Sequence, residues 1–344
     1  MTVVHPYRAL MVKRLTWLGL GAGTLATLVV TDILTGPALL GFGEVAGAIW
    51  APESADPTVA AIVNIIRMPM TLMAMLVGVG LGIAGTHMQT ILGNPLASPY
   101  TLGFSAAAGF GAAAAILTGF QLPLVPNLTI PLAAFTMASL AALLVYGFAR
   151  MRGMSPEIMV LAGIATLFLF QSMQSMVQYL ASPEVLQEIV FWLFGSMLKA
   201  NWTNVPITGI VVVLGILLLL PDTWKLTALR LGDERASSIG VDVRRLRIKV
   251  FMVVAMLTAG AVAFVGTIGF VGLVAPHLAR MLVGEDQRIL IPMAGLMGAI
   301  VMTSASIVSK LISPGTVVPI GIVTAVIGVP FLFLLIIKGK RRFW

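Results

Sequence analysis

Apolar runs separated by short polar segments recur along the whole chain. A helix of about 20 apolar residues is long enough to cross the ~30 Å hydrocarbon core of a bilayer. Bounded by Pro, Gly and charged residues, these runs predict ten helical spans. The spans cover residues 16–38, 68–92, 101–119, 127–149, 157–180, 204–221, 247–269, 270–283, 289–311 and 318–338. Because the eighth is too short to cross alone, it is predicted to be a partial span.

The fold class follows from this pattern together with the composition. Of the 344 residues, 59% are hydrophobic and only 10% are charged, whereas soluble domains carry about 25% charged residues. No linker or low-complexity tract divides the chain, so we expect an all-α polytopic membrane protein whose single transmembrane domain spans residues 1–344. The absence of cysteine excludes disulfide bonds and thiolate metal sites.

The charged residues between the spans predict the orientation of the chain. Most Lys and Arg residues fall on one side, including Arg14 near the start and Lys338, Lys340, Arg341 and Arg342 at the end. The positive-inside bias identifies this side, with both termini, as the cytoplasmic face of the inner (cytoplasmic) membrane. This asymmetry accounts for the net charge of +8, so no nucleic-acid partner is predicted. The opposite face has three cations and five acids: Arg67, Lys199, Lys310, Glu44, Glu53, Asp56, Glu184 and Glu188.

The chain lacks the groups that would let it drive transport by itself. It contains no Gly-x-x-x-x-Gly-Lys-Ser/Thr phosphate loop, so ATP binding by that device is excluded. The intramembrane acids that an ion-coupled carrier usually needs are nearly missing, since Asp32 and Glu157 lie towards span ends. The scattered His5, His87 and His277 argue against an enzyme and against a metal site. A transporter of this kind must take its energy from a partner, so a cytoplasmic docking surface is expected.

The longest polar interval, residues 222–249, predicts such a surface. It reads DTWKLTALRLGDERASSIGVDVRRLRIK. Its spacing predicts two short helices joined at Gly232, with Asp233 capping the second helix and Gly240 ending it. Lying at the cytoplasmic interface over about residues 225–241, they would form a compact surface for another protein. The alternative is an ordinary amphipathic connector.

A polar stripe in the fifth span predicts part of a pathway. Gln171, Gln174, Ser175 and Gln178 recur at the spacing of one helical face. Amides that face lipid lose their hydrogen bonds, so this face should line a wet cavity or bond to a neighbouring helix. We favour the cavity, because a stripe of this length exceeds what helix packing normally uses.

Two further features concern helix packing. The stretch GTIGFVGLVAPHLARMLVG, residues 266–284, carries Pro276, His277 and Arg280 where a short span descends to the cytoplasmic surface. Pro276 should start or kink the last turns, and Arg280 should reach lipid headgroups or a partner. A structural, hydrogen-bonded histidine is expected at position 277.

Small residues that permit close helix contact occur in the second and tenth spans: Gly78, Gly82, Gly85, Gly321, Ala325 and Gly328.

Four segments resemble a known family, in order and at its expected spacing. They are RMPMTLMAMLVGVGLGIAGTHMQTILGNPLASPYTLGFSAAAG (67–109), LGDERASSIGV (231–241), FVGLVAPHLAR (270–280) and VPIGIVTAVIGVPFLFLL (318–335). From about residue 60 to 338 the chain resembles the FecCD-type permeases. These are the membrane subunits of ATP-binding-cassette (ABC) importers for iron–siderophore complexes, haem and vitamin B12. The resemblance implies the type II importer fold of the vitamin B12 permease, with about ten transmembrane helices.

The resemblance also implies an assembly. Two permeases, identical or related, would enclose a central pathway, and an extracytoplasmic binding protein would deliver the substrate. Two cytoplasmic ATPase subunits would bind ATP and Mg²⁺, and this chain would hold no cofactor or metal. Asn94, Pro95 and the Pro276–His277 turn would belong to the cytoplasmic packing, together with Arg280. The ATPase-coupling surface would comprise Gly232, Asp233, Glu234, Arg235, Ala236, Gly240 and Val241.

The chain departs from the family pattern where the binding protein would dock. Outer Arg residues of the family usually meet acids on that protein. Family members often have a second Arg where this chain has Met70, and acids near Ser306 and at the position of Val317. These replacements leave Arg67 and Lys310 for docking. The alternative for Arg67 is an internal partner such as Glu53 or Asp56. The three departures are Met70, Ser306 and Val317.

Together these features predict an all-helical permease subunit of an ATP-driven importer of iron chelates. Iron–siderophore complexes are the preferred cargo. Haem or a corrinoid is the alternative cargo within the family. An ion-coupled secondary carrier is the alternative outside it. The chain itself is expected to catalyse no reaction.

Overall fold

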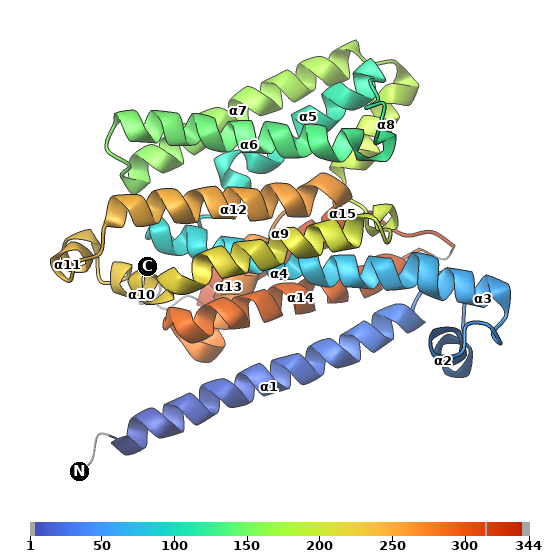
Figure 1. Ribbon diagram of the computed structural model, residues 1–344, viewed down its shortest axis with the longest axis horizontal. Helices are drawn as coiled ribbons and strands as arrows, with labels where there is room; N and C mark the ends of the chain where they lie inside the picture. The colour runs from blue at the N-terminus through green and yellow to red at the C-terminus, as the bar shows by residue number, and fades with distance from the viewer. Residues whose placement is uncertain (1–3, 314, 339–344) are drawn as a thin grey trace.

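The computed structural model describes residues 4–313 and 315–338, and within these ranges the chain folds into helices without strands (Figure 1). Lys340, Arg341 and Arg342 lie outside the described residues. The long helices are α1 (Val4–Leu34), α4 (Met68–Ile91), α6 (Thr129–Met151), α7 (Pro156–Leu180), α9 (Asn204–Leu219), α12 (Val243–Val265), α14 (Gln287–Leu311) and α15 (Ile320–Lys338). The shorter ones are α2 (Phe42–Trp50), α3 (Pro57–Ala61), α5 (Phe104–Thr118), α8 (Pro183–Leu193), α10 (Thr223–Leu229), α11 (Asp233–Ser238) and α13 (Val271–Val283). A π-helical turn, Ile62–Arg67, joins α3 to α4.

Each predicted span is a helix in the structure. Among the described residues, seven helices are long and apolar enough to cross a membrane, and three shorter apolar helices complete the ten. α13 is the predicted partial span, with 13 residues. α5 is also short, because Gly103 and Gly119 adopt φ values of +85° and +60° at its two ends. These are left-handed backbone conformations that favour glycine and interrupt a helix.

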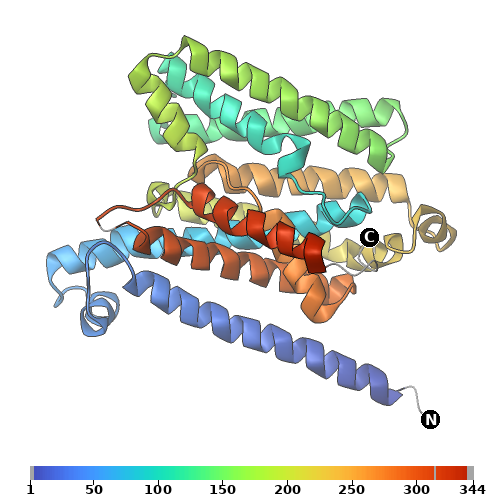
Figure 2. The ribbon, with the colours of Figure 1, turned by 180° about the vertical axis from the view of Figure 1, so that it is seen from behind.

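α4 is the central helix of the bundle and packs against α9, α12, α13 and α14 (Figures 1 and 2). Its glycines explain how the helices approach so closely. A Cβ atom at Gly78 would overlap the carbonyl group of Gly298 on α14, and one at Gly85 would overlap that of Gly272 on α13. The predicted close helix contacts are therefore confirmed for α4.

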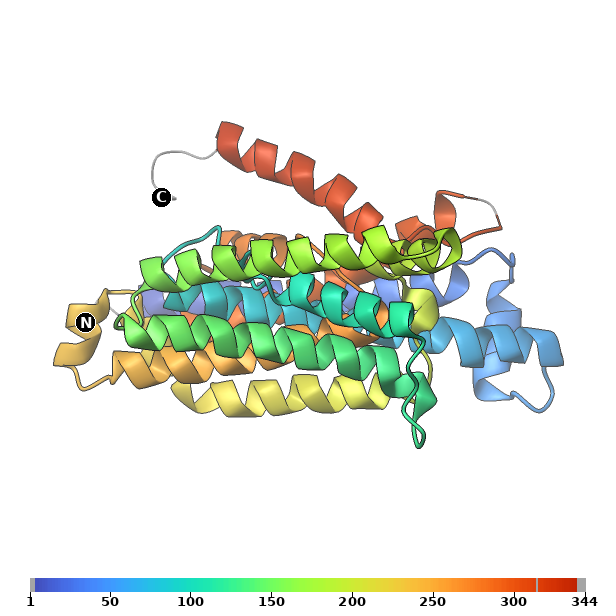
Figure 3. The same ribbon diagram turned by 90° about the horizontal axis from the view of Figure 1, so that it is seen from above.

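Two helices lie at the edge of the bundle. α1 packs mainly on α14 and leaves apolar side chains such as Leu15, Leu20 and Val30 exposed. α15 stands away from the other helices when the molecule is seen from above (Figure 3). Its exposed Val326 and Phe333 form an apolar face. These faces suit lipid or another membrane subunit, since neither can stay in water at low cost.

The two ends of the bundle differ in the elements that they carry. α10 and α11 lie at the same end as the start of α1, and α2 and α3 lie at the opposite end (Figure 1). The basic residues of the polar interval 222–249 therefore share one end with Arg14. This arrangement agrees with the predicted division of charge between the two membrane faces.

Candidate coupling surface and translocation pathway

The coupling segment, which we define as residues 223–241, folds into the two short helices α10 and α11. Gly232 precedes α11 with φ +102°, and Gly240 follows it with φ +88°. Both values lie in the region that favours glycine. The expected pair of short helices joined by a glycine is present, at the end of the bundle that carries the start of α1.

The coupling segment presents only some of its expected residues. Glu234 and Arg235 are exposed, and the apolar Ile239 is 57% exposed. Ala236 is 0% exposed and Val241 is buried. The sequence assigned both to the docking surface, and the structure corrects this: they pack beneath it. The exposed face that a partner could contact is formed by Glu234, Arg235 and Ile239.

Asp233 has a different role from the predicted helix cap. Gly232 is the N-cap residue of α11, without a side-chain cap. The two carboxylate oxygens of Asp233 each accept a hydrogen bond of 2.7 Å from the guanidinium of Arg247. Arg247 also donates from Nε to the carbonyl of Ile91 at 3.0 Å. This paired geometry is stronger than a single cap bond, and it ties α11 to α12 and to the end of α4.

A second acid fixes the start of the coupling segment. Asp222 is almost fully buried and lies 2.6 Å from Nζ of Lys225 and 2.5 Å from Nζ of Lys249. Because Lys225 belongs to α10 and Lys249 to α12, one carboxylate joins the two helices. The pairs are partly buried, so salt screens them less than exposed pairs.

Arg280 is held inside the protein. Its side chain is only 8% exposed, and its Nε lies 3.0 Å from Oε1 of Glu285. Nη2 donates to the Gln89 side chain of α4 at 2.9 Å. The other carboxylate oxygen of Glu285 lies 2.7 Å from Nη2 of Arg230, directly after α10. The prediction that Arg280 reaches headgroups or a partner is therefore wrong, because the distant Gln89 and the nearby Glu285 hold its guanidinium inside the protein.

The other signature residues lie nearby. Pro276 is buried inside α13, and the ring of His277 packs edge-on against Phe331 with centroids 6.0 Å apart. Asn94 and Pro95 form the turn after α4, where the Asn94 side chain accepts a hydrogen bond from the backbone N–H of Leu96. These contacts are compatible with an architectural role.

A cavity of about 630 Å³ lies between the start of α13 and α15. Leu193 and Phe194 at the end of α8 line it, and Phe270 lies before α13 on its wall. Gly321 and Val326 of α15 complete this mostly apolar space. It is large enough for a sizeable organic ligand group. It lies on the side of the bundle from which α15 projects (Figure 3).

The polar stripe of α7 lies on an outward face of the single chain. Gln171 and Ser175 are exposed, and Gln178 is half-buried. Gln174 packs against α5, where a Cβ atom at Gly109 would meet its side-chain oxygen at 2.5 Å. Seen from above, α7 and α15 lie along the same side of the bundle (Figure 3). A pathway role for this stripe stays a prediction.

The outer cations are turned inward. Arg67 is buried and donates to the carbonyl groups of Ile33, Leu34 and Ala38, which lie at and after the end of α1. The sequence expected it to dock a binding protein or to pair with Glu53 or Asp56. The structure corrects both expectations, since backbone carbonyls of a distant segment enclose the guanidinium.

Lys310 is buried in the same way. Its Nζ lies 2.9 Å from a carboxylate oxygen of Asp32 and donates to the Asp32 carbonyl at 2.8 Å. The other carboxylate oxygen accepts 2.6 Å from the hydroxyl of Thr71. The expected docking role of Lys310 is thus corrected, because its ammonium is not accessible. Ser306 and Met70 are also buried, and Val317 is half-buried.

The third outer cation, Lys199, is half-buried, and its Nζ is covered by the protein. Burial lowers the pKa of Lys199 to about 8, and the nearby charge of Glu188 opposes this shift. Its Nζ lies 5.2 Å from the ring centroid of Trp192. The exposed charges at this end are consequently acidic: Glu44, Glu53, Asp56, Glu184 and Glu188.

Comparison with known proteins identifies the family. The sequence profile of the FecCD transport family matches residues 24–338. The chain belongs to the FecCD transport family. The Fe(3+)-citrate import system permease protein YfmD of Bacillus subtilis is 35% identical, over 81% of this chain and 82% of its own. The cobalamin import system permease protein BtuC of Halobacterium salinarum is 36% identical, over 84% of this chain and 76% of its own.

A solved structure extends the likeness to the fold of this FecCD permease. An inward-facing metal-chelate type ABC transporter superposes with a TM-score of 0.82 and is 30% identical, covering 93% of this chain and 98% of that one. The chain is thus the permease subunit of an ABC importer, a multi-pass membrane protein. Its partners include another permease subunit and ATPase subunits. The resemblance read from the four sequence segments is confirmed.

Several structural residues of the FecCD permease were missed by sequence reasoning. The pairs Asp32–Lys310 and Asp222–Lys249 carried no signal, because the two members of each pair lie far apart in sequence. The helices α2, α3 and α8 lie outside the ten predicted spans. Local signals did exist for two of them: Asp56 before Pro57 caps α3, and Ser182 before Pro183 caps α8.

Proposed function

We propose that this chain forms the translocation pathway of an importer for iron chelates of the siderophore class. The observation that carries the proposal is the fold-level match to a metal-chelate type transporter over 93% of the chain. The Fe(3+)-citrate permease of Bacillus subtilis, 35% identical, supports the same class of cargo. The mostly apolar cavity beside α13 and α15 suits a bulky chelate, which is recognised mainly by shape.

The proposed assembly places this chain in the inner membrane with both termini in the cytoplasm. A second permease copy, or a related one, would pack along the side that carries α7 and α15, and lipid would cover α1. Two ATPase subunits would bind ATP and Mg²⁺ and dock on the coupling segment, so this chain would not hydrolyse ATP. An extracytoplasmic binding protein would deliver the chelate. The contact of Arg14 with Asp286 at the end that carries the coupling segment supports the cytoplasmic placement of the amino end.

The test is uptake by the purified assembly in proteoliposomes. The permease, its ATPase and its binding protein are reconstituted together, and uptake of a ⁵⁵Fe-siderophore, haem and cobalamin is compared. We expect ATP hydrolysis to drive uptake of the ferric siderophore well above the other two cargoes, and a non-hydrolysable ATP analogue to abolish it. Preferential uptake of haem or cobalamin would contradict the cargo assignment. Uptake that follows a proton gradient without ATP would contradict the ATP-driven mechanism.

A further inference from the structure

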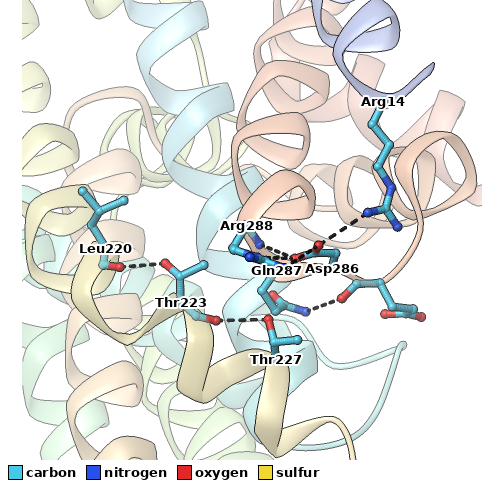
Figure 4. Close-up of polar contacts among 8 residues, drawn as sticks. Arg14, Leu220, Thr223, Thr227, Asp286, Gln287 and Arg288 are labelled. Carbon is cyan, nitrogen blue, oxygen red and sulfur yellow. Dashed lines mark hydrogen bonds and ion pairs between the residues drawn. The ribbon is translucent and has the colours of Figure 1, made fainter. Parts of the chain in front are cut away.

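The link between α13 and α14 holds two acids that face different helices. The link contains only Gly284, Glu285 and Asp286. Asp286 contacts Arg14 of α1 at 3.4 Å and Arg288 of α14 at 3.2 Å. Figure 4 shows this junction, where α10 packs beside the start of α14. Glu285 instead contacts the coupling segment.

One carboxylate joins the coupling segment to α13. Arg230 lies between α10 and α11, with Nη2 2.7 Å from Oε2 of Glu285. Arg280 lies in the last turn of α13, with Nε 3.0 Å from Oε1. A displacement of α10 is therefore passed through Arg230 to the carboxylate of Glu285, which also holds the end of α13. Glu285 itself is 46% exposed, so its pair with the partly exposed Arg230 adds little to folding stability, whereas its pair with the buried Arg280 is screened less by solvent.

α13 connects this junction to the cavity. The helix has 13 residues, which corresponds to a length of about 20 Å. It begins directly after Phe270, which lines the cavity and has φ +66°, an unusual value for an aromatic residue. α13 is one continuous helix from Val271 to Val283, with Pro276 inside it, so a shift at Arg280 is expected to reach the cavity wall.

We propose that Glu285 is a positioning residue that transmits movement of the coupling segment to α13 and so to the cavity. The inference rests on the proposed docking of the ATPase on the coupling segment. It concerns how ATP hydrolysis is linked to transport and does not depend on which chelate is carried.

The first test uses the isosteric variant Glu285→Gln in the assembled transporter. Assembly and ATP hydrolysis should persist, while the amount of substrate moved per ATP falls roughly tenfold, a typical size for coupling between sites. Arg230→Gln should have the same effect, and the double variant should be no worse than either single variant. Arg14→Gln is the matched control, because it breaks the neighbouring pair with Asp286 and should leave the ratio unchanged.

A second measurement is independent of the cargo. Because the chain has no cysteine, Leu273→Cys gives a single reporter on α13 at the cavity wall. Its labelling by a maleimide should change when a non-hydrolysable ATP analogue binds the assembly, and this change should be lost with Glu285→Gln. A full nucleotide response in the Glu285→Gln variant, an unchanged ratio of transport to ATP, or additive effects in the double variant would overturn the inference. If the cargo assignment fails, the labelling response still tests the link.

Discussion

The carboxylate of Asp32 holds the outer end of α1 against the bundle. It is fully buried and contacts both the ammonium of Lys310 and the hydroxyl of Thr71. The guanidinium of Arg67 donates hydrogen bonds to the backbone carbonyl groups of Ile33 and Leu34, the residues that follow Asp32. Since most of α1 faces outward, these few polar contacts attach its end to α14 and α4.

Asp32→Asn should destabilise the permease strongly. The substitution leaves the ammonium of Lys310 buried without a charged partner, which typically costs about 3–5 kcal/mol. The double variant Asp32→Leu with Lys310→Met removes both charges and should recover much of this loss. Thermal unfolding in detergent, followed by size-exclusion chromatography, measures both. Equal stability of the single variant and the wild type would show that water or lipid reaches the ammonium.

At the scale of elements, α11 has one buried face and one exposed face. Ala236 lies on the buried face, and Ile239, directly after the last residue of α11, is exposed. An Arg at position 236 would therefore disturb the packing of α11 on α12 before it could block a partner. Ala236, which the family resemblance assigned to the coupling surface, therefore supports that surface from beneath.

Ile239→Arg should weaken ATPase association without unfolding the permease. Replacing an exposed apolar interface residue by a charge should cost about 1–2 kcal/mol, or roughly tenfold in affinity. Ala236→Arg should lower thermal stability as well, while Leu39→Arg, on the exposed outer end, should affect neither. Co-purification with the ATPase and a thermal unfolding scan separate these outcomes. Normal association of the Ile239→Arg variant would move the docking surface away from this face.

At the scale of the whole molecule, the side that carries α7 and α15 is the place for a pathway or a second subunit. α7, which carries the polar stripe, and α15, which carries the apolar face, both lie there (Figure 3). In a single chain both are exposed to lipid, which is costly for amides. Assembly with a second permease would place the stripe beside a shared, hydrated space.

Cysteine labelling tests this arrangement in the naturally cysteine-free chain. Gln171→Cys and Gln178→Cys should react quickly with a water-soluble maleimide in the assembled transporter. Gln174→Cys should react more slowly, because that side chain packs against Gly109. Leu169→Cys and Met173→Cys, exposed in the single chain but on other faces, should react least because lipid covers them. Similar reactivity at all five positions would favour helix packing over a wet pathway.

The sequence by itself determined the spans, their order and the end to which most charges belong. The reason is local: in a bilayer, an apolar run of about 20 residues must satisfy its own backbone, and only a helix does so within one segment. The small residues of α4 were equally readable, because helix spacing places Gly78 and Gly82 on one face. The coupling helices followed from their glycines and polarity.

Only the tertiary structure decided what each charged residue contacts. Gln89 lies 191 positions before Arg280, and Asp32 lies 278 positions before Lys310. Local pattern places a side chain near a membrane face, but its partner depends on which helices pack together. For the same reason Ala236 and Arg67 read as surface residues in the sequence. Burial of a charge is favourable only where the folded chain supplies an acceptor, and that acceptor comes from another helix.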